Sequence, residues 1–161
     1  MAIDVQYLLD LEGIKRLRYR FARALDTASP DALADLFTDD GWIDVGPFGR
    51  MEGRERIRRG YKRAYEGGPE WHTMHCVSNP QILVEGDTAT GNWQLIELSM
   101  RSPDQPVSII AVYDDEYRRV DGEWKLAGVT LSFKWSAHMG IVDDDHPMTI
   151  PPRPAHTAVP S

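Results

Sequence analysis

Residues 72–100 read HTMHCVSNPQILVEGDTATGNWQLIELSM, and this stretch decides the class of fold. Apolar and polar side chains alternate along it with period two, which indicates β-strands that bury one face. The tripeptide Glu85-Gly86-Asp87 interrupts the alternation with a tight-turn signal of the kind that joins two strands of a hairpin. The stretch therefore predicts strands over residues 72–78, 81–85 and 88–100.

Upstream of this stretch, apolar residues recur every three or four positions, which indicates amphipathic helices. The first predicted helix ends near Asp26. A second helix is predicted over residues 31–37, with Ser29 as its N-cap and Pro30 at its first position. A third helix is predicted over residues 54–66.

Further strands are predicted on both sides of the quoted stretch. A short strand covers residues 42–45, and two longer ones cover residues 107–119 and 124–135, with a turn at Asp121-Gly122 between them. Helices followed by a run of antiparallel strands are typical of α+β domains. The sequence predicts an α+β fold in which a cone-shaped, curved antiparallel or mixed sheet wraps around three N-terminal helices. A pocket is expected at the open end of the cone.

The composition fits a globular protein. The chain has 161 residues, of which 42% are hydrophobic, and a formal net charge of −7. We expect one domain over residues 1–142 and a proline-rich tail over residues 143–161. The negative charge disfavours nucleic acid as a partner, because a nucleic-acid groove needs a basic surface. No apolar run reaches the roughly 20 residues that span a bilayer, so no membrane partner is expected.

Several motif classes are missing from the sequence. There is no glycine-rich phosphate loop, serine nucleophile elbow or zinc-protease motif. The acidic run at residues 143–146 is interpreted as a solvated segment, so neither a metal nor a cofactor is expected. Cys76 is the single cysteine, which excludes an internal disulfide and predicts a small apolar filler. The N-terminal segment carries acids and no basic region, so a cytoplasmic location is predicted.

Asp26 and His75 form the candidate catalytic pair. His75 shares one face of its predicted strand with Trp71, Thr73 and Val77. Asp26 ends an amphipathic helix, where the helix dipole disfavours a carboxylate, so a buried Asp26 needs a partner. An imidazole would supply that partner, and the pair could abstract a proton while the carboxylate orients the ring. A plain helix C-cap at Asp26 and a packing role for His75 are the alternatives.

Glu97 and Tyr113 are candidate polar residues of the pocket. Glu97 interrupts the apolar alternation of Trp93, Leu95 and Ser99, and a charge on a core face is either paired or in a wet cavity. A different register would instead turn Glu97 outward. Tyr113 could present its hydroxyl to the pocket or could simply pack.

Five segments of the sequence form a recognisable set: FARALD (21–26), LADLFTDD (33–40), EGRERI (52–57), DTATGNW (87–93) and YRRVDGEWK (117–125). Together they resemble the SnoaL-like proteins of the nuclear transport factor 2-like superfamily. The resemblance extends over about residues 8 to 136 and implies the cystatin-like α+β fold.

Within that superfamily the sequence is most similar to a lyase branch that includes scytalone dehydratase, bile acid 7α-dehydratase and hexachlorocyclohexane dehydrochlorinase. In that branch an Asp at the end of the first helix orients a strand His that removes a proton, and Asp26 and His75 match these positions. The resemblance implies a cofactor-independent lyase of dehydratase type that acts on a hydrophobic small molecule, and a homodimer or homotrimer. An isomerase or polyketide cyclase, or a non-catalytic ligand-binding module, are the alternatives.

The sequence departs from that branch where its members carry electrophilic helpers. Phe21, Val45 and Leu131 are apolar at positions where those enzymes carry polar or charged side chains. The pocket is therefore expected to have an apolar or aromatic lining that suits a hydrophobic small molecule. Its expected lining joins the polar Glu97 and Tyr113 to a set of apolar residues: Phe21, Trp42, Val45, Trp93, Leu131, Phe133 and Trp135.

Overall fold

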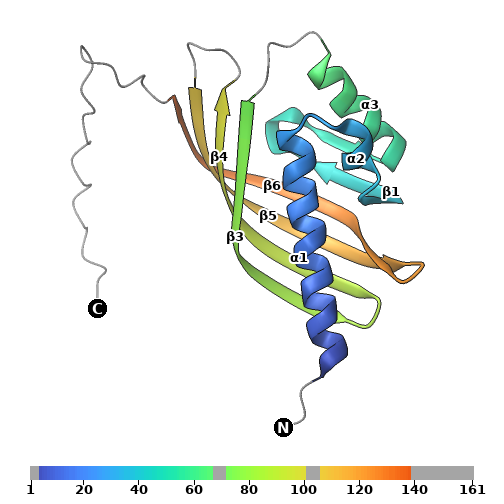
Figure 1. The fold of residues 1–161 in the computed structure, drawn as a ribbon. Coiled ribbons are helices and arrows are strands. Elements are labelled where there is room, and N and C mark those ends of the chain that lie inside the picture. Colours follow the sequence, from blue (N-terminus) through green and yellow to red (C-terminus); the bar gives the residue numbers. More distant parts are fainter. Residues whose placement is uncertain (1–3, 67–71, 101–105, 139–161) are drawn as a thin grey trace, which may run out of the picture.

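The computed structural model describes residues 4–66, 72–100 and 106–138, and Figure 1 shows their arrangement. The three helices are α1 (Val5–Asp26), α2 (Pro30–Ala34) and α3 (Arg54–Tyr65). Between α2 and α3 lie strand β1 (Phe37–Asp44), the short 3-10 helix η1 (Gly46–Phe48) and strand β2 (Arg50–Glu52). Four long strands follow: β3 (His72–Glu85), β4 (Thr88–Met100), β5 (Pro106–Val120) and β6 (Glu123–His138).

The six strands form one sheet in the order β2-β1-β6-β5-β4-β3. Neighbouring strands are antiparallel except for β1 and β6, which run parallel. The sheet is strongly curved, and α1 lies along one face of it (Figure 1). The predicted α+β fold, with a curved mixed sheet around three N-terminal helices, is confirmed.

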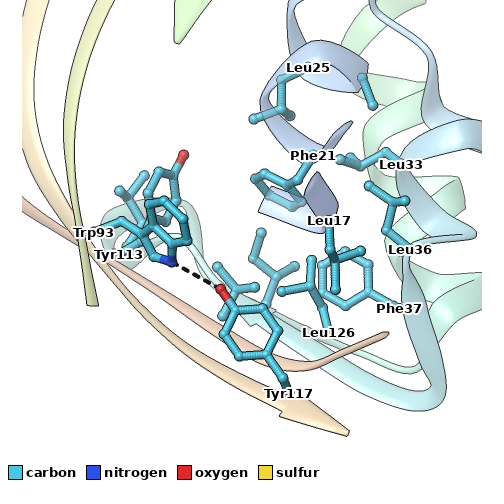
Figure 2. Packing of buried hydrophobic residues seen from close by; sticks show 14 of the residues in the cluster. Leu17, Phe21, Leu25, Leu33, Leu36, Phe37, Trp93, Tyr113, Tyr117 and Leu126 are labelled. Carbon is cyan, nitrogen blue, oxygen red and sulfur yellow. Dashed lines mark hydrogen bonds between the residues drawn. The ribbon is translucent and has the colours of Figure 1, made fainter. Parts of the chain in front are cut away.

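Helix α1 carries the apolar stripe that fills the inside of the sheet. Its first turn is capped by Asp4, whose carboxylate accepts a hydrogen bond from the Tyr7 N–H at 3.2 Å. Leu17, Phe21 and Leu25 follow at helical spacing, and Figure 2 shows them on the side of α1 that faces the other core residues. Burial of this stripe stabilises the helix more than its intrinsic propensity does.

The predicted second helix is too long. Helix α2 ends at Ala34, and Phe37 already belongs to β1. Phe37 pairs with Leu126 of β6, and the Leu126 N–H donates a hydrogen bond to the Leu36 carbonyl at 2.9 Å. Pairing with a strand that is distant in sequence therefore overrides the local helical pattern. Leu36 and Phe37 are buried, but burial alone does not distinguish a helix from a strand.

Strand β3 joins two predicted strands into one through an irregular step between Ser78 and Gln81. Asn79 has a φ of 50° at this step, in the left-handed region that asparagine tolerates better than most residues. The step inserts one extra residue into β3, and such a bulge exchanges the two faces of the strand beyond it. In the part of β3 before the bulge, which includes His75, the odd-numbered residues therefore face inward, as predicted.

A second bulge, in β6, turns Trp135 to the outer face of the sheet. Ala111 pairs with Phe133, whereas the adjacent Ile110 pairs with Trp135, so β6 has one extra residue at this point. Ile110 and Trp135 are each about half exposed. They belong to an outer apolar patch on the face away from α1, formed by Met74, Cys76, Ile96, Leu98, Ile110 and Trp135. The prediction that Cys76 fills apolar space is wrong, because its side of β3 faces outward.

Within the described ranges, no helix combines the length and apolar character needed to cross a membrane. The predicted proline-rich tail over residues 143–161, with its acidic run at residues 143–146, lies outside the described residues.

Candidate active site

Asp26 and His75 meet where the end of α1 passes over β3. Asp26 Oδ1 lies 2.7 Å from His75 Nδ1. Because an ionised carboxylate only accepts hydrogen bonds, Nδ1 carries the proton in this contact and Nε2 keeps its lone pair. The side chain of His75 is 9% exposed and that of Asp26 is 24% exposed. The arrangement suits a histidine base whose ring is oriented by a carboxylate.

Asp26 accepts two further kinds of hydrogen bond from β3. The backbone N–H of His75 lies 3.1 Å from Oδ1 and 3.3 Å from Oδ2, and Thr73 Oγ1 donates to Oδ1 at 3.2 Å. The C-terminal end of a helix repels a carboxylate, so these donors offset the unfavourable position at the end of α1. The face of Thr73 was predictable from the strand alternation, but its contact with Asp26 was not.

Glu97 lies directly opposite His75 on β4. Its Oε2 is 3.6 Å from His75 Nε2, and its side chain is 10% exposed. Directly opposed residues of neighbouring strands share a face, so the register that turns His75 inward turns Glu97 inward as well. An ionised Glu97 in this position can stabilise the imidazolium that forms when Nε2 takes up a proton.

A cavity of about 340 Å³ opens beside His75 and Glu97, which is near the lower end of the size range of small-molecule sites. Its walls come from α1, α3, the η1 region and the strands. No lysine or arginine is among its described lining residues, and most of them are apolar. They are Leu25, Val45, Phe48, Met51, Gly60, Tyr61, Ala64, Tyr65, Thr73, His75, Glu97, Ile109, Tyr113, Leu131 and Phe133.

Five residues of the predicted lining border this cavity: Val45, Glu97, Tyr113, Leu131 and Phe133. Phe21 and Trp93 lie deeper, in the hydrophobic core. The ring of Phe21 packs edge-on against Tyr113, with 6.1 Å between centroids. Trp93 is fully buried, and its indole N–H donates to the Tyr117 hydroxyl at 3.0 Å, as Figure 2 shows.

The other two predicted lining residues, Trp42 and Trp135, lie on the outer face of the sheet. Trp42 covers Gly128 of the neighbouring strand, where a side chain would collide with the indole, and the Arg50 guanidinium stacks 3.8 Å from its ring. The bulge in β6 carries Trp135 to the same outer face. An unbroken alternation through Phe133 would have kept Trp135 inside.

Helix α3 brings Tyr61 and Tyr65 to the cavity, and neither was predicted to be a site residue. Their spacing of four positions on one helical face was the available signal. Burial raises the pKa of Tyr65 to about 12, and burial also raises the pKa values of Tyr61 and Tyr113 well above the ordinary 10.0. All three phenols are therefore protonated at neutral pH and can donate hydrogen bonds.

The described part of the chain contains no group of three or more His, Cys, Asp and Glu side chains placed to hold a metal ion. Its cavity instead combines the His75 base, the Glu97 carboxylate and three phenols, and the Asp26 carboxylate orients the base. These groups can remove a proton, pass it on and donate hydrogen bonds to an oxygen.

A curved mixed sheet wrapped on three helices places the protein in the class of proteins with a cystatin-like fold, which a solved NTF2-like protein of Novosphingobium aromaticivorans shares. The chain belongs to the SnoaL-like domain family, whose sequence model matches residues 6–130. The matched region includes Asp26, His75 and Glu97.

Known proteins are moderately similar to this chain in sequence or in fold. An uncharacterized protein of Mycobacterium tuberculosis is 26% identical over 127 residues, which cover 77% of this chain and 85% of the relative. The scytalone dehydratase-like protein AacuK of Aspergillus aculeatus is 24% identical over 143 residues, with coverage of 80% and 81%. The crystal structure of hexachlorocyclohexane dehydrochlorinase LinA-type3 from Novosphingobium barchaimii has a TM-score of 0.75 at 23% identity, with coverage of 92% and 100%. This last likeness is one of fold.

Proposed function

We propose that this chain is a cofactor-independent lyase of dehydratase type, in which His75, oriented by Asp26, removes a proton from a hydrophobic small molecule. The observation that carries the proposal is the 2.7 Å contact between Asp26 Oδ1 and His75 Nδ1, because it leaves Nε2 free to act as a base at the cavity. Membership of the SnoaL-like family and the similarity to a scytalone dehydratase-like protein support the same class.

The elimination begins when His75 Nε2 takes a proton from the carbon next to the activating group. The electron pair of the broken C–H bond moves onto the oxygen of that group and forms an enolate. Glu97 Oε2, 3.6 Å from Nε2, takes the proton from the imidazolium and gives it to the departing hydroxyl. The enolate electrons then form the carbon–carbon double bond, the C–O bond breaks, and one water molecule leaves.

The substrate proposed for this site is an uncharged alcohol with an apolar ring and a carbonyl group. Glu97 lines the cavity and no lysine or arginine side chain is among the described lining residues, so the cavity wall itself holds no cation that would select a substrate charged before the reaction. Phe48 and Phe133 contact each other edge-on at 6.2 Å and provide an aromatic wall. A cavity of about 340 Å³ limits the substrate to a compact molecule.

A second reaction class uses the same base. His75 and Glu97 face each other across neighbouring strands, so a proton taken from one carbon could be returned to another carbon of the same substrate. That reaction would be an isomerisation, or a ring closure of the polyketide cyclase type. Loss of water lowers the mass of the product, whereas isomerisation and aldol-type addition leave the mass unchanged, so mass spectrometry separates the two classes.

The test is turnover of a panel of compact cyclic compounds that carry a hydroxyl group β to a carbonyl. We expect loss of water from at least one member, and a fall of about a hundredfold or more in kcat for His75→Ala and for Asp26→Asn. Thr90→Ala, on the outer face of β4, is the matched control and should keep wild-type turnover. Near-normal turnover by His75→Ala contradicts the mechanism. Tight binding of panel members without any turnover would indicate a ligand-binding module.

A further inference from the structure

Arg18 of α1 is a basic side chain with no solvent exposure at all. It lies about two helical turns before Asp26 on the same helix. Its guanidinium carbon is 3.5 Å from the centroid of the Tyr113 ring and 4.5 Å from that of the Phe21 ring. The guanidinium is thus packed against two aromatic faces, which attract a cation.

The charge of Arg18 is only weakly neutralised. Its nearest acidic group is Asp115, whose Oδ2 is 3.5 Å from Nη1, and none of its three guanidinium nitrogens has a hydrogen-bond partner among the described residues. The Tyr117 hydroxyl donates to the same Asp115 oxygen at 2.6 Å. Burying a cation in this way costs free energy, and an apolar side chain of similar size would avoid that cost. Packing alone therefore does not account for an arginine at this position.

Tyr113 separates the buried charge from the cavity. Its ring stacks on Arg18, and Tyr113 also lines the cavity. Its hydroxyl points away from that of Tyr117, as Figure 2 shows, and makes no hydrogen bond within the described part of the chain. A cation against the face of a phenol ring withdraws electron density from the oxygen, which makes the hydroxyl a stronger donor.

The elimination proposed above requires a counter-charge that the cavity wall does not supply. Proton abstraction creates an oxyanion in a cavity that is lined by the Glu97 carboxylate and by no described lysine or arginine. Among the buried side chains of the described residues, Arg18 is the single cation. Fixed donors and charges aimed at the developing charge are the usual means of stabilising such an anion.

We propose that Tyr113 donates a hydrogen bond to the substrate oxygen that becomes negative, and that Arg18 is a positioning residue that acts through the Tyr113 ring. The chemical role that this inference gives to Tyr113 and Arg18 rests on the proposed lyase function. It also narrows the substrate class to compounds whose activating group is an enolisable carbonyl oxygen. The stabilisation itself is a property of binding and can be measured without turnover.

The probe is 4-nitrophenol, whose absorbance shows whether it is bound as phenol or as phenolate, compared with nitrobenzene, which lacks the oxygen. Tyr113→Phe keeps the ring and removes only the hydroxyl. Arg18→Met removes the charge, and Arg18→Met combined with Asp115→Asn avoids leaving a buried unpaired carboxylate. Arg16→Met replaces an exposed arginine of the same helix and is the matched control. Circular dichroism and thermal unfolding identify variants that remain folded.

We expect the wild type to bind 4-nitrophenolate, and Tyr113→Phe and the Arg18→Met/Asp115→Asn variant each to weaken that binding about tenfold. Nitrobenzene affinity should change less than about twofold in both, because its apolar contacts are retained. The loss of charge at Arg18 should have little further effect in a Tyr113→Phe background, as expected for residues that act as one unit.

Three results would overturn the inference. The first is a wild type that binds nitrobenzene but not 4-nitrophenolate, and the second is an equal loss of affinity for the two ligands in the Tyr113 and Arg18 variants. The third is an effect of the Arg18 substitution on phenolate affinity that is as large in a Tyr113→Phe background as in the wild type. A protein with Tyr113-dependent phenolate binding but no His75-dependent elimination would therefore keep this inference and lose the proposed function.

Discussion

The carboxylate of Asp26 holds both the ring and the backbone of His75. One oxygen accepts from Nδ1 at 2.7 Å and from the backbone N–H at 3.1 Å. The imidazole cannot turn without breaking the first contact, and β3 cannot slide along α1 without breaking the second. The position of Nε2 is therefore determined jointly by a helix end and a strand, which is the precision that a general base requires.

Thr73 supports this contact by donating a hydrogen bond to the same carboxylate at 3.2 Å. We expect Thr73→Val to lower kcat about tenfold, because one hydrogen bond to a charged group is lost while the shape of the side chain is kept. Thr73→Ser should retain most of the activity. Turnover of the identified substrate by the two variants is the measurement. Equal activity of Thr73→Val and the wild type would show that the remaining contacts suffice to orient Asp26.

Asn79 forms the bulge that places His75 on the inner face. Its φ of 50° is costly for a β-branched residue, and its side chain donates to Gln94 Oε1 at 2.7 Å. We expect Asn79→Val to lower the free energy of unfolding by about 1–2 kcal/mol, measured by urea denaturation. Asn79→Gly should cost less, because glycine adopts positive φ freely. A similar loss in both variants would mean that the side-chain hydrogen bond matters more than the backbone conformation.

The raised pKa values of three phenols that line the cavity predict a loss of stability at alkaline pH. Burial raises the pKa of Tyr65 to about 12, and the pKa values of Tyr61 and Tyr113 are raised for the same reason. Above about pH 10 these groups lose their protons in the unfolded chain but keep them in the folded one, so the unfolded state gains stability as pH rises. Thermal unfolding should show a Tm that falls above this pH.

Tyr61→Phe should reduce the steepness of that fall, because one of the raised pKa values is removed. Tyr19→Phe is the matched control, since Tyr19 is half exposed. Its alkaline transition should remain that of the wild type. A Tyr61→Phe protein with an unchanged slope would show that this phenol does not contribute to the transition.

The outer apolar patch predicts self-association, and we propose that another copy of this chain covers it as a homodimer or homotrimer. Ile110 is 45% exposed and Trp135 is 51% exposed, side by side on neighbouring strands. Burial of a contiguous apolar surface stabilises association, and a charge placed within it opposes association. Ile110→Glu should therefore shift the protein towards monomer in analytical ultracentrifugation. Thr90→Glu, on the same face outside the patch, should not, and a monomeric wild type would contradict the proposal.

The sequence by itself determined the succession of helices and strands, the alternation that places His75 and Thr73 on one face, and the family resemblance that singled out Asp26. These features depend on periodicity within single elements, or on motifs a few residues long, and both are local properties of the chain. The tight turn at Glu85-Gly86-Asp87 was also predictable from the sequence, because turn geometry depends on a few adjacent residues.

Only the tertiary structure decided how these elements are combined. The bulge in β6 turns Trp135 to the outer face of the sheet. Phe37, which was predicted to be helical, instead belongs to β1 because it pairs with β6. Arg18 could be seen in the sequence only as a residue next to the apolar stripe, since the ring on which it stacks, Tyr113, comes from a strand far along the chain. Bulges, strand pairing and buried charge all depend on partners distant in sequence, and a local pattern carries no information about such partners.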